Sequence, residues 1–70
     1  MSVASVIETS ATSETSFEDA IEQGVARATK TLRNVTGAWV KEQHVQMSDG
    51  QIVGYQVNLK ITCVMEEPEA

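Results

Sequence analysis

The sequence has a single cysteine, Cys63, and one proline in 70 residues, and it lacks any long apolar run. One cysteine excludes an internal disulfide. No segment approaches the roughly 20 apolar residues that a membrane span needs, and no basic region followed by an apolar segment opens the chain as a signal peptide would. A lone cysteine without an export signal fits a reducing compartment. We therefore expect a cytoplasmic protein with no membrane partner.

Basic residues are also scarce, since five Lys and Arg stand against ten Asp and Glu and leave a net charge of −5. Binding to a phosphate backbone requires clustered Lys and Arg, so the composition argues against nucleic acid as a partner. The chain has no Ser-His-Asp set, no carboxylate pair that can be placed as catalytic groups, and no glycine-rich phosphate loop. We expect a protein that is not an enzyme.

Aromatic residues number only three, Phe17, Trp39 and Tyr55. The 70 residues allow one domain, spanning 1–70, and a chain of this size buries only about 60% of its unfolded surface. Small chains with so thin a core commonly need oligomerisation to be stable.

What the sequence does contain is an Asp-Gly pair between two apolar-rich runs. Asp49-Gly50 is typical of a two-residue hairpin turn in which both residues adopt φ > 0. It predicts strands over 37–47 and 52–65 and pairs Ser48 with Gln51.

Counting along both strands from this turn assigns the remaining pairs of the hairpin. Trp39 then faces Lys60 and Val40 faces Leu59, and the count also gives the pairs Gln43–Gln56, His44–Tyr55 and Lys41–Asn58. The apolar face comprises Ala38, Val40, Tyr55, Val57, Leu59, Ile61, Cys63 and Met65. The opposite face is polar apart from Trp39 and carries Lys41, Gln43, Gln56, Asn58, Lys60 and Thr62. The apolar face is the expected core, and the polar face is left for solvent, a ligand or a second subunit.

An amphipathic helix is predicted over 17–32, with Ser16 as its N-cap and Asp19 three residues later. Apolar side chains recur at helical spacing, at Phe17, Ala20, Ile21, Gly24, Val25, Ala28 and Leu32. A short strand over 3–9 and a Ser- and Thr-rich connection over 10–16 precede the helix. The chain is therefore predicted to be α+β, in the order β-α-β-β.

The predicted hairpin is longer than the predicted helix. A strand of ~13 residues spans about 40 Å, whereas a helix of ~16 residues spans about 24 Å. The helix cannot cover the whole apolar face, and proteins avoid leaving such a face exposed. We expect other copies of the chain to cover the remainder, in a homo-oligomer.

This order of elements resembles the dodecin family over nearly the whole chain. The residues that carry the resemblance are Ile7-Glu8, Thr12-Ser13, Ser16-Phe17-Glu18, Ala20-Ile21, Ala26-Arg27-Ala28, Lys30-Thr31-Leu32-Arg33, Val40-Lys41-Glu42, Tyr55-Gln56-Val57 and Met65-Glu66. The resemblance implies a three-stranded antiparallel sheet wrapped around one helix. It also implies a hollow homododecamer that stores flavins, riboflavin or FMN, in pairs at subunit contacts and without catalysis.

In the flavin-binding members of that family, a Trp at the start of the second strand stacks on the isoalloxazine ring and a Gln of the third strand bonds to it. The resemblance places that Gln at Gln56. The stacking position falls on Gly37, with Trp39 two residues later on the same face, and a family Arg aligns with His44. The stretch Gly37–Gln43 is closer to a flavin-free branch associated with calcium. The alternative is therefore a flavin-free shell with an ion-binding or structural role.

Each candidate residue also has a structural interpretation. Trp39 is either a displaced platform for the flavin or an anchor at a subunit contact. Gln56 either bonds to the mixed donor and acceptor edge of a flavin or belongs to a polar ladder between strands. We interpret His44 as a hydrogen-bonded structural residue, because no second His lies at metal-binding spacing, and Cys63 as a small buried hydrophobe.

Overall fold

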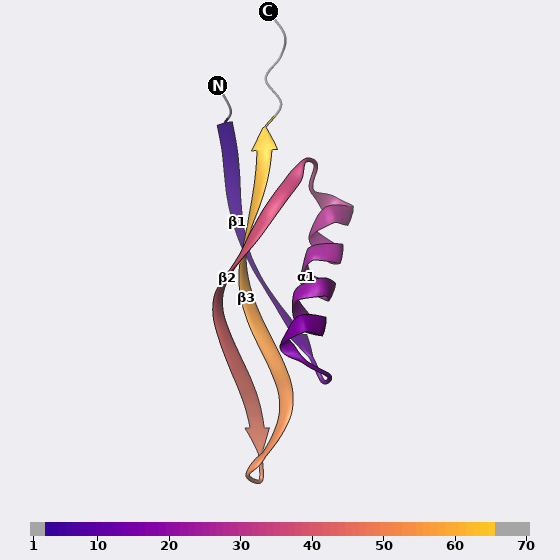
Figure 1. Cartoon of the computed structure of the whole chain (residues 1–70), viewed down its shortest axis with the longest axis vertical. Coiled ribbons are helices and arrows are strands. Elements are labelled where there is room, and N and C mark those ends of the chain that lie inside the picture. Colours follow the sequence, from indigo (N-terminus) through magenta and orange to yellow (C-terminus); the bar gives the residue numbers. More distant parts are fainter. Residues whose placement is uncertain (1–2, 66–70) are drawn as a thin grey trace, which may run out of the picture.

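The computed structural model describes residues 3–65, which form three strands and one helix (Figure 1). The elements are β1 (Val3–Ser13), α1 (Phe17–Thr31), β2 (Val35–Ser48) and β3 (Gln51–Met65). The sheet has the order β1-β3-β2 and is antiparallel throughout. The predicted β-α-β-β order and single-helix architecture are confirmed. The helix α1, which is the one helix within residues 3–65, is not long and apolar enough to cross a membrane.

The first strand is longer than predicted, since residues 10–13 continue β1 and only the segment after Ser13 connects it to the helix. The prediction of a connection over 10–16 was wrong here. Ser10 pairs with Asn58 and Ser13 with Tyr55, so the ladder with the long β3 fixes these residues. Composition alone favours a loop for a segment rich in Ser and Thr, but Thr is β-branched and also fits a pleated surface.

The start of α1 is fixed by hydroxyl groups on two serines. Ser16 is the N-cap, and its Oγ accepts a hydrogen bond from the backbone N–H of Asp19 at 3.0 Å. Ser13 is buried, accepts from the backbone N–H of Thr15 at 2.9 Å, and donates its hydroxyl to the Asp19 carboxylate at 2.6 Å. These bonds tie the last residue of β1 to the first turn of α1.

The helix ends at Thr31, and the N–H of Leu32 bonds to the Ala28 carbonyl at 2.9 Å.

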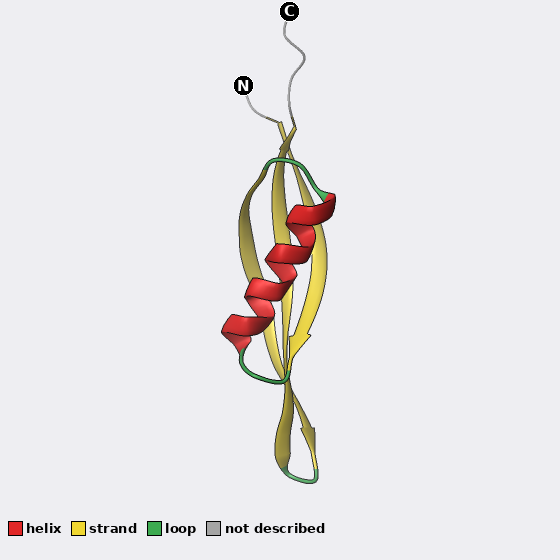
Figure 2. Cartoon of the chain, turned by 90° about the vertical axis from the view of Figure 1, so that its right-hand side faces the viewer, coloured by secondary structure: helices red, strands yellow, loops and turns green. Residues whose placement is uncertain are grey.

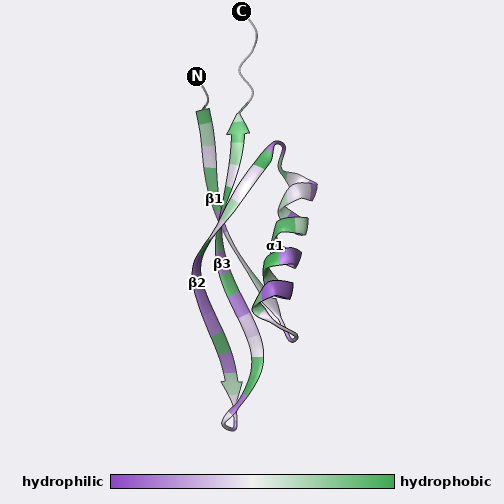
Figure 3. Cartoon of the chain, in the orientation of Figure 1, coloured by the Kyte–Doolittle hydropathy of each residue, from purple (hydrophilic) through white to green (hydrophobic). Residues whose placement is uncertain are grey.

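The core lies between α1 and one face of the sheet (Figure 2). The small residues of the helical stripe, Ala20, Gly24 and Ala28, are the buried ones, and the sheet contributes Val57, Leu59, Ile61 and Cys63. A Cβ atom at position 24 would lie 2.8 Å from Leu59 Cδ1. The missing side chain therefore allows the helix to approach the central strand closely. Hydrophobic bands recur along α1 in Figure 3.

The hairpin turn is formed as predicted, with Asp49 at φ 51, Gly50 at φ 75, and Ser48 paired with Gln51. The ladder beyond it contains register shifts that simple counting misses. On β3, Val53 has no cross-strand partner, because it lies between the pairs Met47–Ile52 and Gln46–Gly54. On β2, Lys41 has no cross-strand partner, because it lies between the pairs Val40–Leu59 and Glu42–Asn58. Each is a β-bulge, in which one extra residue on one strand is left unpaired.

The two bulges lie on opposite strands, so the second cancels the first. Beyond it, the predicted pairs Trp39–Lys60 and Val40–Leu59 are confirmed. The prediction was wrong between the bulges, where His44 faces Gln56 and not Tyr55. Gln43 faces Val57 and therefore lies on the helix side of the sheet, not on the polar face.

The left-handed conformation of Gly50 gives a test of the turn. Gly50→Val should lower the free energy of unfolding by roughly 1–2 kcal/mol, because a side chain at φ > 0 clashes with its own backbone. No neighbouring atom lies within 4 Å of a Cβ at this position, so packing does not contribute to the loss. The measurement is the thermal midpoint at a fixed protein concentration. The matched control is Gly50→Asn, because Asn tolerates the left-handed region, and equal losses in both variants would contradict the assigned turn.

Candidate functional site

One face of the sheet carries no helix, and we call it the outer face (Figure 1). Its side chains alternate with the buried residues of β3 and with their partners on the flanking strands. By this pairing the outer face includes Val6, Glu8, Ser10, Thr12, Gly37, Trp39, Glu42, His44, Gln46, Gln56, Asn58, Lys60 and Thr62. Most of these side chains are polar, and the large apolar exceptions are Val6 and Trp39, of which Trp39 is 72% exposed.

Four polar side chains on the outer face form one hydrogen-bonded chain, which we call the amide row. Gln46 Nε2 donates to Gln56 Oε1 at 3.3 Å, and Gln56 Nε2 donates to Asn58 Oδ1 at 3.1 Å. Asn58 Nδ2 then donates to Glu42 Oε1 at 3.0 Å. An amide has two hydrogens and two acceptor lone pairs. Gln56 therefore keeps one N–H and one lone pair for a further partner.

All four candidate residues from the sequence lie on the outer face, but the structure brings only two of them together. His44 and Gln56 are direct cross-strand partners. Trp39 faces Lys60, two rows of side chains away from Gln56 along β3, which corresponds to about 13 Å. Gly37 faces Thr62, one row further. A single chain therefore does not place an aromatic ring beside Gln56.

Gly37 lies next to open space, since no atom lies within 4 Å of a Cβ built at this position. It has no positive φ that would require glycine. The backbone of a single chain can therefore carry a large side chain at this position. An aromatic ring is missing here because the residue is glycine, and not because the backbone or its neighbours exclude a ring.

An ion pair crosses the outer face beside the amide row. Lys41, the residue left unpaired by its bulge, reaches from β2 over β3 to Glu8 on β1, with Nζ and Oε1 2.8 Å apart. Its hydrogen bond and positive charge lower the pKa of the Glu8 carboxyl, and Glu8 in turn raises the pKa of Lys41. A shallow pocket of about 260 Å³ lies beside the pair and is also lined by Glu42 and Asn58.

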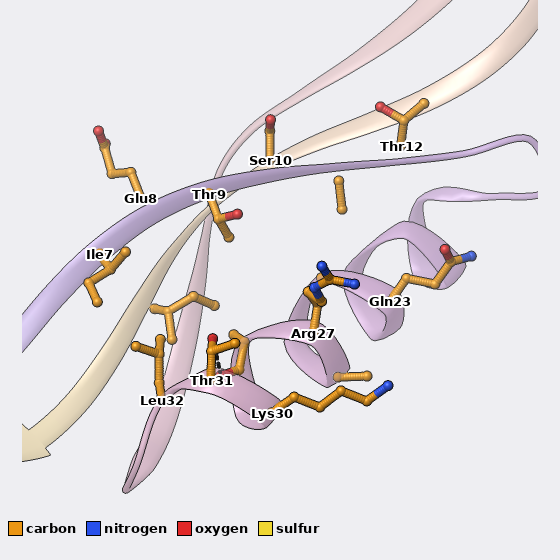
Figure 4. A pocket seen from close by; sticks show the side chains of 15 residues that line it. Ile7, Glu8, Thr9, Ser10, Thr12, Gln23, Arg27, Lys30, Thr31 and Leu32 are labelled. Atoms are coloured by element: carbon orange, nitrogen blue, oxygen red, sulfur yellow. Dashed lines mark hydrogen bonds between the residues drawn. The ribbon is translucent and has the colours of Figure 1, made fainter.

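A larger groove of about 620 Å³ runs between α1 and the edge strand β1 (Figure 4). Its floor is apolar and is made by Ile7, Ala11, Gly24, Ala28, Leu32 and Ile61. Gln23, Arg27 and Lys30 of the helix also line the groove. This groove lies on the core side of the sheet, away from the amide row.

The sequence did not predict the amide row, in which Glu42, Gln46 and Asn58 are bonded in a chain with Gln56. The sequence shows that Gln56 and Asn58 share one face of β3. Their cross-strand partners on β2, His44 and Glu42, depend on the bulge at Val53 and do not follow from counting. Cys63 is buried, in agreement with its reading as a small hydrophobe. Within residues 3–65 there is no group of three His, Cys, Asp or Glu side chains that could hold a metal ion.

Comparison with known proteins gives a consistent match in sequence and in structure. The family model of the dodecins matches residues 3–66. Dodecin from Streptomyces coelicolor is 33% identical, with a TM-score of 0.88 over 96% of each chain. Dodecin from Streptomyces davaonensis is 33% identical, with a TM-score of 0.87 over 94% of this chain and 97% of that one.

A tryptophan-to-phenylalanine variant of Thermus thermophilus dodecin is 36% identical to this chain, with a TM-score of 0.88 over 96% of this chain and all of that one. The comparison with curated proteins finds no match.

The ion pair between Lys41 and Glu8 predicts a specific titration behaviour. The pKa of Glu8 in the folded chain should lie below the usual range of a glutamate carboxyl, because Lys41 donates a hydrogen bond to it and carries a positive charge, and Lys41→Met should return the pKa toward that range. Because the folded pKa is the lower one, the stability from Glu8 is present above its unfolded pKa and is lost as the pH falls through its folded pKa. The measurement is an NMR titration of the Glu8 side-chain carboxyl.

Lys60→Met is the matched control, since the charge of Lys60 makes the weakest contribution to the lowered pKa. If both substitutions raise the pKa of Glu8 equally, the hydrogen bond with Lys41 is not the cause of the shift.

Proposed function

The chain belongs to the dodecin family, and from this we propose that it is a non-catalytic protein that binds and stores a flavin in a hollow homododecamer. The ligand is riboflavin or FMN. Membership in the family and the match of the whole fold to solved dodecins support this function.

The observation that carries the proposal is the free hydrogen-bonding capacity of Gln56 on an uncovered face of the sheet. After its two bonds in the amide row, Gln56 keeps one N–H and one lone pair. The pyrimidine edge of an isoalloxazine ring offers both acceptors and an N–H donor. A single amide can therefore satisfy two neighbouring atoms of this edge.

The proposed site needs more than one chain. Trp39 and Gln56 lie on the same face but are about 13 Å apart along the sheet. A flavin held between the outer faces of two copies would contact Gln56 of one copy while Trp39 of the other covers its ring. Such an arrangement also buries the large exposed side chain of Trp39.

The shape of the chain supports assembly. Its radius of gyration is 14.8 Å, whereas about 11 Å is expected for a compact domain of this length. Large apolar side chains are exposed toward the ends of the sheet, at Val3, Met47, Ile52, Val53 and Met65, and Val6 is exposed on the outer face. The hairpin tip extends past the end of α1 in Figure 2. Contacts with other copies would remove these side chains from water.

A second candidate is a flavin-free shell with an ion-binding or structural role. The observation that favours it is Gly37, which leaves open space where the stacking ring of the family lies. Outer-face carboxylates such as Glu8 and Glu42 would then offer oxygen ligands for calcium where several copies meet.

Titration with riboflavin separates these candidates. The parent protein should quench flavin fluorescence, Trp39→Ala should abolish the quenching, and Gln56→Ala should weaken binding by roughly threefold to tenfold, because one or two hydrogen bonds are lost. Gln43→Ala is the matched control, since this Gln lies on the opposite face of the same hairpin.

The absence of binding by the parent at tens of micromolar riboflavin would refute flavin storage and favour the shell. In that case Gly37→Trp tests the scaffold, because it restores a ring at a position with open space. Gain of binding by this variant would mean that only the stacking ring is missing.

Assembly is tested independently of the ligand. Native mass spectrometry at micromolar concentration should show a species of twelve copies of the 7.6 kDa chain. A stable folded monomer would contradict the argument from the uncovered strand ends, because those apolar side chains would then tolerate water.

A further inference from the structure

The orientation of the Gln56 amide decides what the outer face offers a ligand. The oxygen and nitrogen of an amide have the same shape but opposite hydrogen-bonding character. Rotating the Gln56 amide by half a turn would exchange its donor and its acceptor. A ligand with an N–H beside a C=O would then meet these groups in the wrong order.

Glu42, at one end of the amide row, decides between the two orientations of the Gln56 amide. A carboxylate is ionised at neutral pH and can only accept hydrogen bonds. Asn58 must therefore turn its Nδ2 toward Glu42, which leaves Oδ1 facing Gln56. Gln56 must in turn donate from Nε2, so that Oε1 faces Gln46.

We propose that Glu42 is a positioning residue, which acts through Asn58 to fix the donor and acceptor order that Gln56 presents to a lactam or imide edge of the ligand. The consequence for the ligand rests on the proposed flavin-binding function, whereas the orientation of Gln56 does not. Glu42 itself does not need to contact the ligand.

The bulge at Val53 puts the correct side chain at the end of the row. With Val53 paired, counting from the turn places Lys41 opposite Asn58, but the observed register places Glu42 there. Lysine only donates hydrogen bonds, so it would impose the reverse order on Asn58 and Gln56. The one-residue shift therefore places an acceptor, Glu42, and not a donor, Lys41, opposite Asn58, where the orientation of the amides in the row is decided.

The other end of the row depends on Gly54. A Cβ atom at this position would lie 2.6 Å from Gln46 Oε1. Glycine thus leaves room for the Gln46 amide to lie over β3, where its Nε2 reaches Gln56 at 3.3 Å. Gln56 therefore has a partner on each side, and its orientation is set from the Asn58 side, where the row ends at Glu42.

The first experiment uses the ligand-free assembly with ¹⁵N-labelled glutamine side chains. The parent should give one set of Gln56 side-chain amide signals. Glu42→Gln allows both orientations and should split or broaden them, and Glu42→Lys should give one shifted set. Adding Asn58→Asp to Glu42→Lys should restore the parent signals, because a carboxylate then again accepts from Gln56 Nε2. Glu8→Gln is the control, since it removes a charge from the same face without touching the row.

Unchanged Gln56 signals in Glu42→Lys would overturn the proposal, as would failure of the added Asn58→Asp to restore them. This outcome does not depend on flavin, so it separates a wrong role for Glu42 from a wrong proposed function.

The second experiment measures riboflavin affinity in the same variants. Glu42→Gln should weaken binding about twofold, because half of the molecules hold the unsuitable orientation. Glu42→Lys should weaken it roughly tenfold, because the donor and acceptor are both mismatched. Addition of Asn58→Asp should recover most of this loss, and Glu8→Gln should leave the affinity unchanged, because Glu8 has no bond to the amide row. Equal losses in Glu8→Gln and Glu42→Gln would mean that charge, and not orientation, is responsible.

Discussion

The contact between α1 and the central strand β3 holds this chain together. Leu59 is almost completely buried, and it lies under Gly24, where a Cβ atom would approach its Cδ1 to 2.8 Å. Ala20 and Ala28 lie one turn to either side of Gly24 and are also buried. Small residues on the helix allow larger ones on the strand to fill the space between the two layers. The position of the helix follows from this fit, and its start is fixed by the bonds from Ser13 and Ser16.

A single helix can cover only one face of a sheet. The covered face uses alternate residues of β3, and the intervening residues, such as Gln56 and Asn58, necessarily point to the other side. The polar character of the outer face is therefore a direct result of the pattern that builds the core. A face without a helix is available for a ligand, and the same alternation aligns the amides that we propose to contact it.

Much of this arrangement could be predicted from the sequence, because it depends on local patterns. The helical stripe, the Asp49-Gly50 turn and the apolar face of β3 each repeat at a fixed spacing, and the structure contains all three. The partner of Gln56 could not be predicted, because a bulge several residues away moves every pair that follows it. Residues 10–13 were missed for a related reason. Their strand conformation comes from pairing with a distant segment, and local composition does not report such pairing.

The bulges also bear on how the length of the chain can vary. Lys41 and Val53 have no partner across the hairpin, so the same set of cross-strand pairs can form in a chain that lacks either of them. Deletion of one of these residues would straighten the hairpin locally, and deletion of Lys41 would also remove the ion pair with Glu8. Length changes are usually accommodated in loops. In this chain, the two bulges are places within the strands where the loss of one residue would leave the cross-strand pairs intact.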